Sequence, residues 1–170
     1  MSKGLETKET ILKSALDFTS KFGLESLSIG ALAKSVGMSK SGLFSHFKSK
    51  ETLQIMVMDY AAENFTLKVI KPAIKAPRGL DRLDAMMNAW LEWSENHMSG
   101  GCPFLSAIVE YDDRPGKVRD HIEVLQSQMI SSFEKAIQIA LDEKQIHAKT
   151  DVEQATYQVY SNMIVHLNLF

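Results

Sequence analysis

The chain of 170 residues contains very little cysteine, since Cys102 is its only one. One cysteine excludes an internal disulfide and is typical of the reducing cytoplasm, where we expect this protein to act. No apolar run approaches the roughly 18 residues that a membrane-spanning helix needs. The first residues, Met1 to Glu6, lack the apolar stretch of a signal peptide. With 45% hydrophobic and 24% charged residues, the composition is that of an ordinary globular protein.

Patterns of β structure and of catalysis are also missing. No segment shows sustained strand alternation, and no internal repeat is visible. We find no Cys-His-Asn set in a familiar context, no phosphate-cradling loop and no His-Glu-x-x-His pair. The five histidines have no metal-ligand spacing. We therefore expect an all-α protein that is not an enzyme and carries no cofactor or metal. The competing hypothesis is an enzyme, a small helical hydrolase that uses Cys102 or a histidine.

Charge is distributed unevenly along the chain. Residues 1–50 contain eight lysines and four acidic residues, whereas residues 51–170 contain eleven basic and seventeen acidic residues. A basic N-terminal part followed by an acidic remainder favours a polyanion-binding domain joined to a solvated one. Ordinary variation of surface charge is the alternative interpretation.

Apolar residues at spacings of three and four predict helices along the whole chain. Gly23 and Gly37 are expected to end two of them, and Ser28 and Ser39 to cap the next two. Pro72 is expected to stop a long helix, and the tract 72–79 is the best candidate for a hinge or boundary. The expected helices span residues 5–22, 29–36, 40–47, 50–71, 80–98, 104–111, 118–142 and 152–170.

Residues 38–47 are too polar for a core helix, yet Leu43 and Phe47 are four apart and would share one helical face. A short apolar helix and a glycine turn at Gly37 precede this stretch. The layout is that of a helix-turn-helix, whose second helix lies in the DNA major groove. The outward positions can all donate hydrogen bonds; they are Lys40, Ser41, Ser45 and His46.

Residues 28–51, SIGALAKSVGMSKSGLFSHFKSKE, closely resemble the TetR (tetracycline-repressor) family of bacterial transcription regulators. The Ser/Thr cap, the A-x-x-x-G turn and the SK-x-x-LY-x-HF-x-SKE pattern are nearly complete. The resemblance implies a homodimeric repressor that a small, largely apolar molecule releases from a pseudo-palindromic operator. It implies a DNA-binding domain over residues 1–49 and a helical regulatory and dimerisation domain over residues 50–170. In the family two helices per subunit build the dimer, and the sequence ends at Phe170 near the end of the first of them. If that end is natural, we expect the dimer to use helix 118–142 or to be weak.

Within this motif we sort the DNA-facing residues by what they would contact. Phosphate contacts fix the position on the duplex, and base contacts read the sequence. Gly42 would allow a close backbone approach to the groove. Two departures from the family pattern are Phe44, which replaces a tyrosine and lacks its hydroxyl, and Gly30, which replaces a long polar residue. The phosphate candidates are Ser28, Ser39, His46, Lys48 and Lys50, and the base readers are Lys40, Ser41 and Ser45.

Bulky and polar groups of the C-terminal part are candidates for an effector pocket between helices. The alternative for each is a place in an ordinary core. Cys102, just before Pro103, suggests a redox-responsive regulator as an alternative function, and a structural Gly-Gly-Cys-Pro turn is the other interpretation of this cysteine. A helical interaction module without DNA binding is a third. The pocket candidates are Met86, Trp90, Trp93, His97, Phe104, Glu110, Tyr111, Met129 and Phe133.

Overall fold

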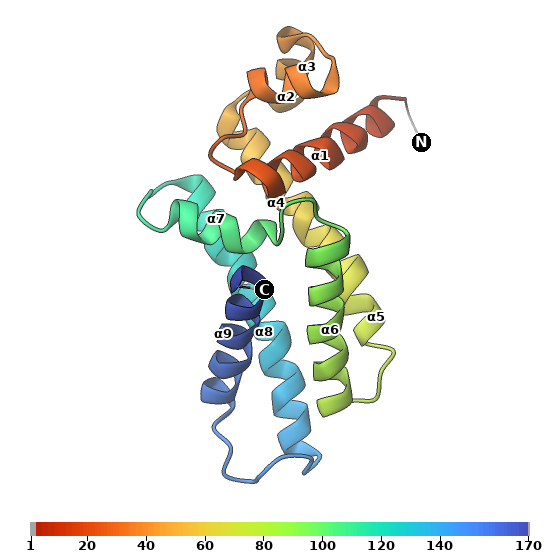
Figure 1. Ribbon diagram of the computed structural model, residues 1–170, viewed down its shortest axis with the longest axis vertical. Coiled ribbons are helices and arrows are strands. Elements are labelled where there is room, and N and C mark those ends of the chain that lie inside the picture. The colour runs from red at the N-terminus through yellow and green to blue at the C-terminus, as the bar shows by residue number, and fades with distance from the viewer. Residues whose placement is uncertain (1–2, 170) are drawn as a thin grey trace. The chain divides into compact units, whose positions relative to one another are not determined.

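The computed structural model describes residues 3–169 and is built from helices, with no strand among those residues (Figure 1), which confirms the all-α prediction. None of the helices in this described part is long and apolar enough to cross a lipid bilayer. The elements are α1 (Lys3–Phe22), α2 (Ile29–Val36), α3 (Lys40–Phe47), α4 (Lys50–Phe65), the π-helix η1 (Thr66–Ile70), α5 (Lys71–Ala73), α6 (Leu80–Asn96), α7 (Pro103–Tyr111), α8 (Lys117–Asp142) and α9 (Val152–Leu169).

The ends of α2 and α3 follow from local capping chemistry, as the sequence predicts. The Ser28 hydroxyl accepts the backbone N–H of Ala31 at 3.1 Å, and the Ser39 hydroxyl accepts that of Gly42 at 3.1 Å. Both caps satisfy amides that the first turn of a helix leaves without a backbone partner. Gly37 ends α2 with φ of 68°, a left-handed conformation that glycine adopts without steric cost.

The prediction that Pro72 ends the long fourth helix is wrong. The chain stays helical through Pro72 to Ala73, but it widens into the π-helix η1 just before the proline. Proline has no N–H for the carbonyl four residues earlier, and its ring crowds that carbonyl. A wider turn at this point accommodates both effects, and a proline is tolerated at the start of the short helix that follows.

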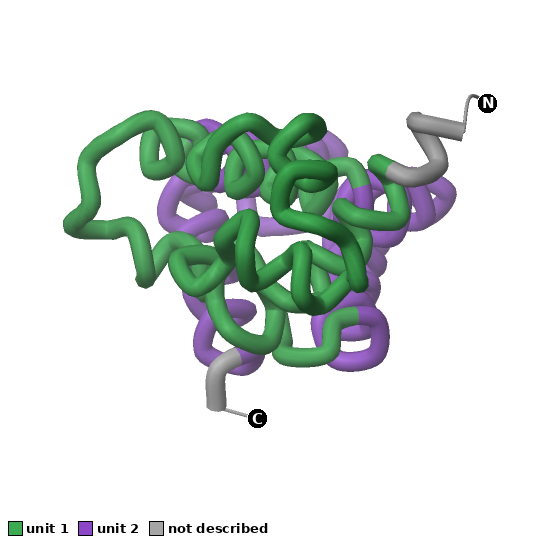
Figure 2. The backbone as a smooth tube through the Cα atoms, turned by 90° about the horizontal axis from the view of Figure 1, so that it is seen from above, with its two compact units in different colours: residues 1–63, 98–123 green, residues 64–97, 124–170 purple. Residues whose placement is uncertain are grey.

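The structure divides into two compact units, coloured green and purple in Figure 2. Unit 1 consists of residues 1–63 and 98–123, and unit 2 of residues 64–97 and 124–170. Each unit therefore combines two separate stretches of the chain. The predicted boundary at residues 49 and 50 concerns which helices bind DNA. The packing units follow a different division, because α4 begins at Lys50 and its residues up to Glu63 belong to unit 1.

Unit 1 has an aliphatic core to which the three N-terminal helices and α4 contribute. Leu24, Leu32, Leu43 and Leu53 are completely buried. α1 packs against both α2 and α7. A β-carbon on Gly100 would lie 2.1 Å from the carbonyl oxygen of Ser20, so only glycine lets this segment pass so close to α1. These contacts make α7 part of the same packed body as the helix-turn-helix.

Unit 2 has an aromatic interior centred on Trp90 of α6. The Phe65 ring meets the Trp90 and Trp93 rings edge-on, with centroids 5.8 and 5.6 Å apart. Phe133 of α8 and Tyr160 of α9 lie on Trp90 at 5.6 and 5.8 Å. Such distances are favourable for aromatic pairs. One tryptophan therefore joins α4, α6, α8 and α9, and the rings of Phe65, Trp90, Trp93, Phe133 and Tyr160 are here called the Trp90 cluster.

Candidate nucleic-acid interface

One side of α3 is buried and the other faces solvent, as the sequence predicts. Leu43 and Phe47 are 0% exposed and anchor the helix in unit 1. On the other side Phe44, the residue that departs from the family pattern, is 54% exposed. An exposed ring on an otherwise polar face lies where it can make apolar contacts with a nucleic acid. Of the residues predicted to meet DNA, Ser39, Lys40, Ser41, Phe44, Ser45, Lys48 and Lys50 are exposed, and Ser28, Gly42 and His46 are partly exposed.

The hydroxyl groups of α3 already make local hydrogen bonds, which restricts what each can offer a partner. Ser45 donates its proton to the carbonyl of Gly42 at 2.7 Å. The hydroxyls of Ser39 and Ser41 lie 3.2 Å apart. Because the hydroxyl proton of Ser45 is already donated to the Gly42 carbonyl, the Ser45 oxygen can only accept a hydrogen bond from a partner. Ser41 and Ser45 therefore differ in the groups that they can recognise.

Lys48 and Lys50 lie near the turn between α3 and α4, yet their surroundings differ. Lys48 caps α3 with φ of 62° and donates its backbone N–H to the carbonyl of Phe44 at 2.8 Å. Its side chain is exposed. The ammonium of Lys50 instead lies 2.8 Å from a carboxylate oxygen of Glu25. The predicted phosphate role of Lys50 thus competes with an acidic partner, which the sequence did not reveal.

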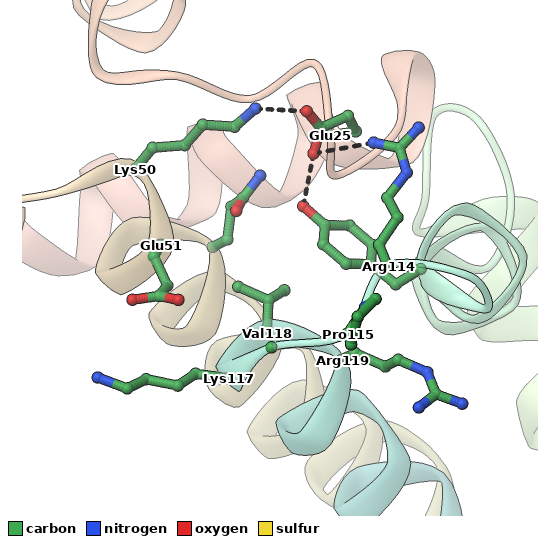
Figure 3. Close-up of a pocket in the computed structure, with 11 residues that line it drawn as sticks. Glu25, Lys50, Glu51, Arg114, Pro115, Lys117, Val118 and Arg119 are labelled. Atoms are coloured by element: carbon green, nitrogen blue, oxygen red, sulfur yellow. Dashed lines mark hydrogen bonds and ion pairs between the residues drawn. The ribbon is translucent and has the colours of Figure 1, made fainter.

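Glu25 is the centre of a polar group that also includes Lys50, Tyr111 and Arg114, here called the Glu25 cluster (Figure 3). The Tyr111 hydroxyl donates to the second carboxylate oxygen at 2.8 Å, and the Arg114 guanidinium lies 3.3 Å from that oxygen. Hydrogen bonds from Lys50 and Tyr111 lower the pKa of Glu25 below its ordinary value. Burial and the bond to Glu25 raise the pKa of Tyr111 above its usual range.

Two further contacts hold the segment that enters α2. Glu110 accepts the backbone N–H of Glu25 at 3.0 Å, and the buried Gln54 amide donates to the carbonyl of Leu24 at 2.8 Å. Gly23 has φ of 83°, and a β-carbon there would lie 1.7 Å from a carboxylate oxygen of Glu110. The connection between α1 and α2 is therefore held by side chains of α4 and α7.

A shallow pocket of about 370 Å³ opens beside the Glu25 cluster. Figure 3 shows Lys50 and Arg114 directed toward Glu25, while Lys117 and Arg119 extend away from it. Arg119 pairs with Glu123 at 2.9 Å. The pocket is thus lined by two acidic and four basic side chains, of which Lys50 and Arg114 pair with Glu25 and Arg119 pairs with Glu123. Its lining residues are Glu25, Lys50, Glu51, Gln54, Tyr111, Arg114, Pro115, Gly116, Lys117, Val118 and Arg119.

The structure separates the residues predicted for an effector pocket. Phe104, Glu110 and Tyr111 belong to unit 1, where Glu110 and Tyr111 contact the α1–α2 connection and Tyr111 also lines the pocket beside the Glu25 cluster. His97 is exposed at the end of α6. The remaining residues belong to unit 2 and are buried; they are Met86, Trp90, Trp93, Met129 and Phe133.

Trp90 has one feature that the sequence could not show. Its ring is 0% exposed, and its indole N–H finds no hydrogen-bond acceptor among the described residues. A buried donor without an acceptor is costly in a folded protein. The Trp90 cluster therefore contains a polar group that an acceptor from a bound molecule would satisfy.

Cys102 precedes the first residue of α7, as expected, but its side chain is only 4% exposed. A buried thiol is shielded from oxidants, and reactivity normally requires an accessible thiolate. The geometry therefore gives the redox alternative no support.

Both parts of the chain match families of known regulators. Residues 11–55 match the family described as "Bacterial regulatory proteins, tetR family". Residues 79–169 match the "Tetracyclin repressor-like, C-terminal domain". The chain belongs to the TetR family. Comparison with curated proteins gave no match.

Solved structures of TetR-fold proteins cover nearly the whole chain. AibR in complex with isovaleryl coenzyme A and operator DNA has a TM-score of 0.77 and 20% identity, over 95% of this chain and 85% of that one. A TetR transcriptional regulator from Chloroflexus aurantiacus J-10-FL has a TM-score of 0.88 and 24% identity, over 99% and 86%. The ketosteroid transcriptional regulator KstR2 of Mycobacterium tuberculosis has a TM-score of 0.68 and 17% identity, over 95% of this chain and 81% of that one. These likenesses establish the fold.

As a TetR-family member, the protein is a ligand-responsive, DNA-binding transcriptional regulator and not an enzyme. Dimers are typical of the family. The helix-turn-helix of α2 and α3 is therefore its DNA-binding element.

Proposed function

We propose that the protein is a cytoplasmic repressor that binds a pseudo-palindromic operator through α3 and leaves it when a small, largely apolar molecule binds. The observation that carries the proposal is the two-sided character of α3. Leu43 and Phe47 are fully buried, while the polar side chains of Lys40, Ser41 and Ser45 on the same helix are exposed. A helix fixed in this way presents its outer side to the major groove as a rigid surface.

The local hydrogen bonds suggest how individual residues meet the operator. Ser45, whose proton is committed to Gly42, accepts from an amino group of cytosine or adenine. Phe44 contacts a thymine methyl group or a sugar. Lys48 binds phosphate, as do Ser28 and Ser39 at the starts of their helices. The other members of the interface are Lys40, Ser41, Gly42, His46 and Lys50.

For the effector, unit 2 offers the Trp90 cluster. A molecule that is mostly apolar and carries one hydrogen-bond acceptor would match the rings and the unsatisfied indole N–H of Trp90. AibR has been solved in complex with isovaleryl coenzyme A and operator DNA, so a protein of this fold can bind an acyl thioester. An acyl group with its carbonyl is one chemistry that fits the cluster.

Dimerisation would use α8 and α9. Val124 on α8 and Tyr157 and Val165 on α9 are exposed apolar residues of unit 2, with Tyr157 68% exposed. Apolar side chains on helix surfaces are what an interface between subunits buries. The two helix-turn-helix elements of such a dimer would bind half-sites whose centres lie about 34–36 Å apart, or a multiple of that distance.

The effector acts only if it binds the DNA-competent and the released states with different affinity. Within unit 1, Glu110 and Tyr111 of α7 both form hydrogen bonds with Glu25 in the α1–α2 connection. A displacement of α7 would therefore also displace the start of α2. We assign to α7 the last step of the signal within this unit.

Selection of duplexes from a random pool by the full-length chain tests the proposal. We expect a pseudo-palindrome to be enriched and its affinity to fall steeply with salt, since the phosphate contacts release counterions. Failure to retain any duplex at about 50 mM salt would contradict the DNA-binding role. Retention without any sequence enrichment would contradict the operator-reading role.

A further inference from the structure

Gly30 lies in the first turn of α2, and the side chain of Lys40, the first residue of α3, reaches toward its α-carbon. A β-carbon on Gly30 would lie 3.3 Å from Cε and 3.7 Å from Nζ of Lys40. The end of the lysine side chain therefore occupies the edge of the space that a side chain at position 30 would fill. This contact belongs to the packing of α2 on α3 within unit 1.

The Lys40 charge lies in a stretch without acidic residues. From Ser26 to Lys50 the chain contains four lysines and no aspartate or glutamate. Within the described part of unit 1, the nearby ion pairs involve Lys21, Lys50 and Arg114, and none includes Lys40. Its ammonium thus remains available to a nucleic acid, in contrast to that of Lys50, which Glu25 holds.

The position of this ammonium matters because lysine is long and flexible. A lysine that is free to sweep over the groove can donate to several neighbouring bases and discriminates poorly among them. Packing of its methylene groups against another helix restricts that sweep while the charged end stays in water. The room above Gly30 offers Lys40 such a support, which a larger residue would remove.

We propose that Gly30 is a specificity-determining residue that acts through Lys40. The space beside its α-carbon seats the Lys40 side chain and so fixes which base the ammonium reaches. Guanine is the base that suits this donor best, since its O6 and N7 are both acceptors in the major groove. Gly30 is a positioning residue here. The inference depends on the proposed operator-reading role of α3.

Substitution of Gly30 separates this role from a structural one. Gly30 lies within α2 and is not among the residues with positive φ, so alanine and leucine both fit the backbone. Both should raise the Tm, because glycine is a poor helix former. Gly30→Ala should shift the Lys40 side chain slightly, and Gly30→Leu should displace it. Neither new side chain can donate to a base, and neither changes the net charge.

The readout is the base preference at each position of the selected duplex, measured with single-base variants. In the native chain, Lys40→Ala should remove about tenfold of discrimination at one guanine position. Gly30→Leu should reduce or move the preference at that same position, and Gly30→Ala should have a smaller effect in the same direction. The salt slope of binding should be unchanged in both Gly30 variants.

The double variant decides whether Gly30 acts through Lys40. In the Lys40→Ala background, Gly30→Leu should change the base preferences no further. A persistent change in that background would overturn the inference, and so would an unaltered preference profile in Gly30→Leu. Ser35→Leu, an exposed substitution in the last turn of α2, is the matched control and should leave every preference as in the native chain.

Failure of the inference is distinguishable from failure of the proposed function. If the native chain binds and discriminates duplexes but the Gly30 variants share its profile, only the role of Gly30 is wrong. If the native chain shows no discrimination at all, the operator-reading role itself is wrong.

Discussion

Unit 1 and unit 2 are each stabilised internally by a different kind of interaction. In unit 1, the connection into α2 is fixed by hydrogen bonds and ion pairs around Glu25 and Glu110. In unit 2, the Trp90 cluster joins four helical segments through ring contacts. Polar contacts depend on geometry and protonation, whereas apolar contacts depend mainly on volume. The contacts that hold the DNA-binding element are therefore sensitive to small displacements of its helices. The stability of unit 2 is instead sensitive to the volume of the side chains in its interior.

Removal of the Trp90 ring should have the largest effect. We expect Trp90→Ala to lower the free energy of unfolding by about 3–5 kcal/mol, because the cavity cannot close around a deleted indole. Chemical denaturation followed by circular dichroism measures the loss. Trp90→Phe keeps most of the volume and removes the unsatisfied N–H, so it should cost much less. Equal losses in the two variants would contradict the account of this cluster.

Gly23→Ala tests the grip of Glu110 on the α1–α2 connection. Alanine would have to adopt the left-handed backbone conformation of Gly23, and its β-carbon would displace the Glu110 carboxylate. We therefore expect the free energy of unfolding to fall by about 2–4 kcal/mol. Gly101 is the matched control: its φ is 91°, and nothing lies within 4 Å of a β-carbon there. Gly101→Ala should therefore show the conformational cost alone, about 1–2 kcal/mol. The grip is refuted if the two variants unfold at the same denaturant concentration.

The Glu25 cluster should make the stability of the protein depend on acidic pH. Because Lys50 and Tyr111 lower the folded-state pKa of Glu25 from 4.5, the unfolded chain takes up a proton first as pH falls. The stabilisation is full above the ordinary carboxyl pKa and is lost as pH falls through the lowered value. Glu25→Gln should reduce this slope in thermal melts between about pH 5 and 3. Glu51→Gln, an exposed carboxylate on α4, is the charge-matched control and should leave the slope nearly intact.

The smallest expected effect distinguishes two neighbouring lysines. Lys48→Ala should reduce the slope of log affinity against log salt by about 1, as the loss of one phosphate contact predicts. Lys50→Ala should reduce it by less, since Glu25 already holds the Lys50 ammonium at 2.8 Å. In the Glu25→Gln background the Lys50 contribution should grow toward that of Lys48. Equal slopes for Lys48→Ala and Lys50→Ala in the native chain would show that Glu25 does not compete with DNA.

Sequence patterns predicted the parts of the fold that local chemistry determines. The caps at Ser28 and Ser39, the left-handed Gly37 and the buried Leu43 and Phe47 all follow from short-range spacing, and the structure confirms them. The end of the fourth helix was predicted wrongly. Proline there is accommodated by a π-helix, an adjustment that propensity alone does not indicate.

The contacts of the Glu25 cluster could not be predicted, because Glu25 and Tyr111 are 86 positions apart. Nothing near either residue in the sequence indicates its partner. Glu110 and Tyr111 had suggested polar groups of an effector pocket, yet the fold uses them to hold the α1–α2 connection. The sequence likewise predicts a phosphate contact for Lys50 but does not indicate its ion pair with Glu25, which is 25 positions away.

Backbone amide shifts measured by NMR during titration with the selected duplex test the central claim most directly. We predict that the largest shifts fall on the first turn of α2 and on the exposed residues between 39 and 48, with smaller shifts at Leu43 and Phe47 on the buried side of α3. Shifts that avoid α3, or that cluster in unit 2 alone, would contradict the account of how this regulator meets DNA.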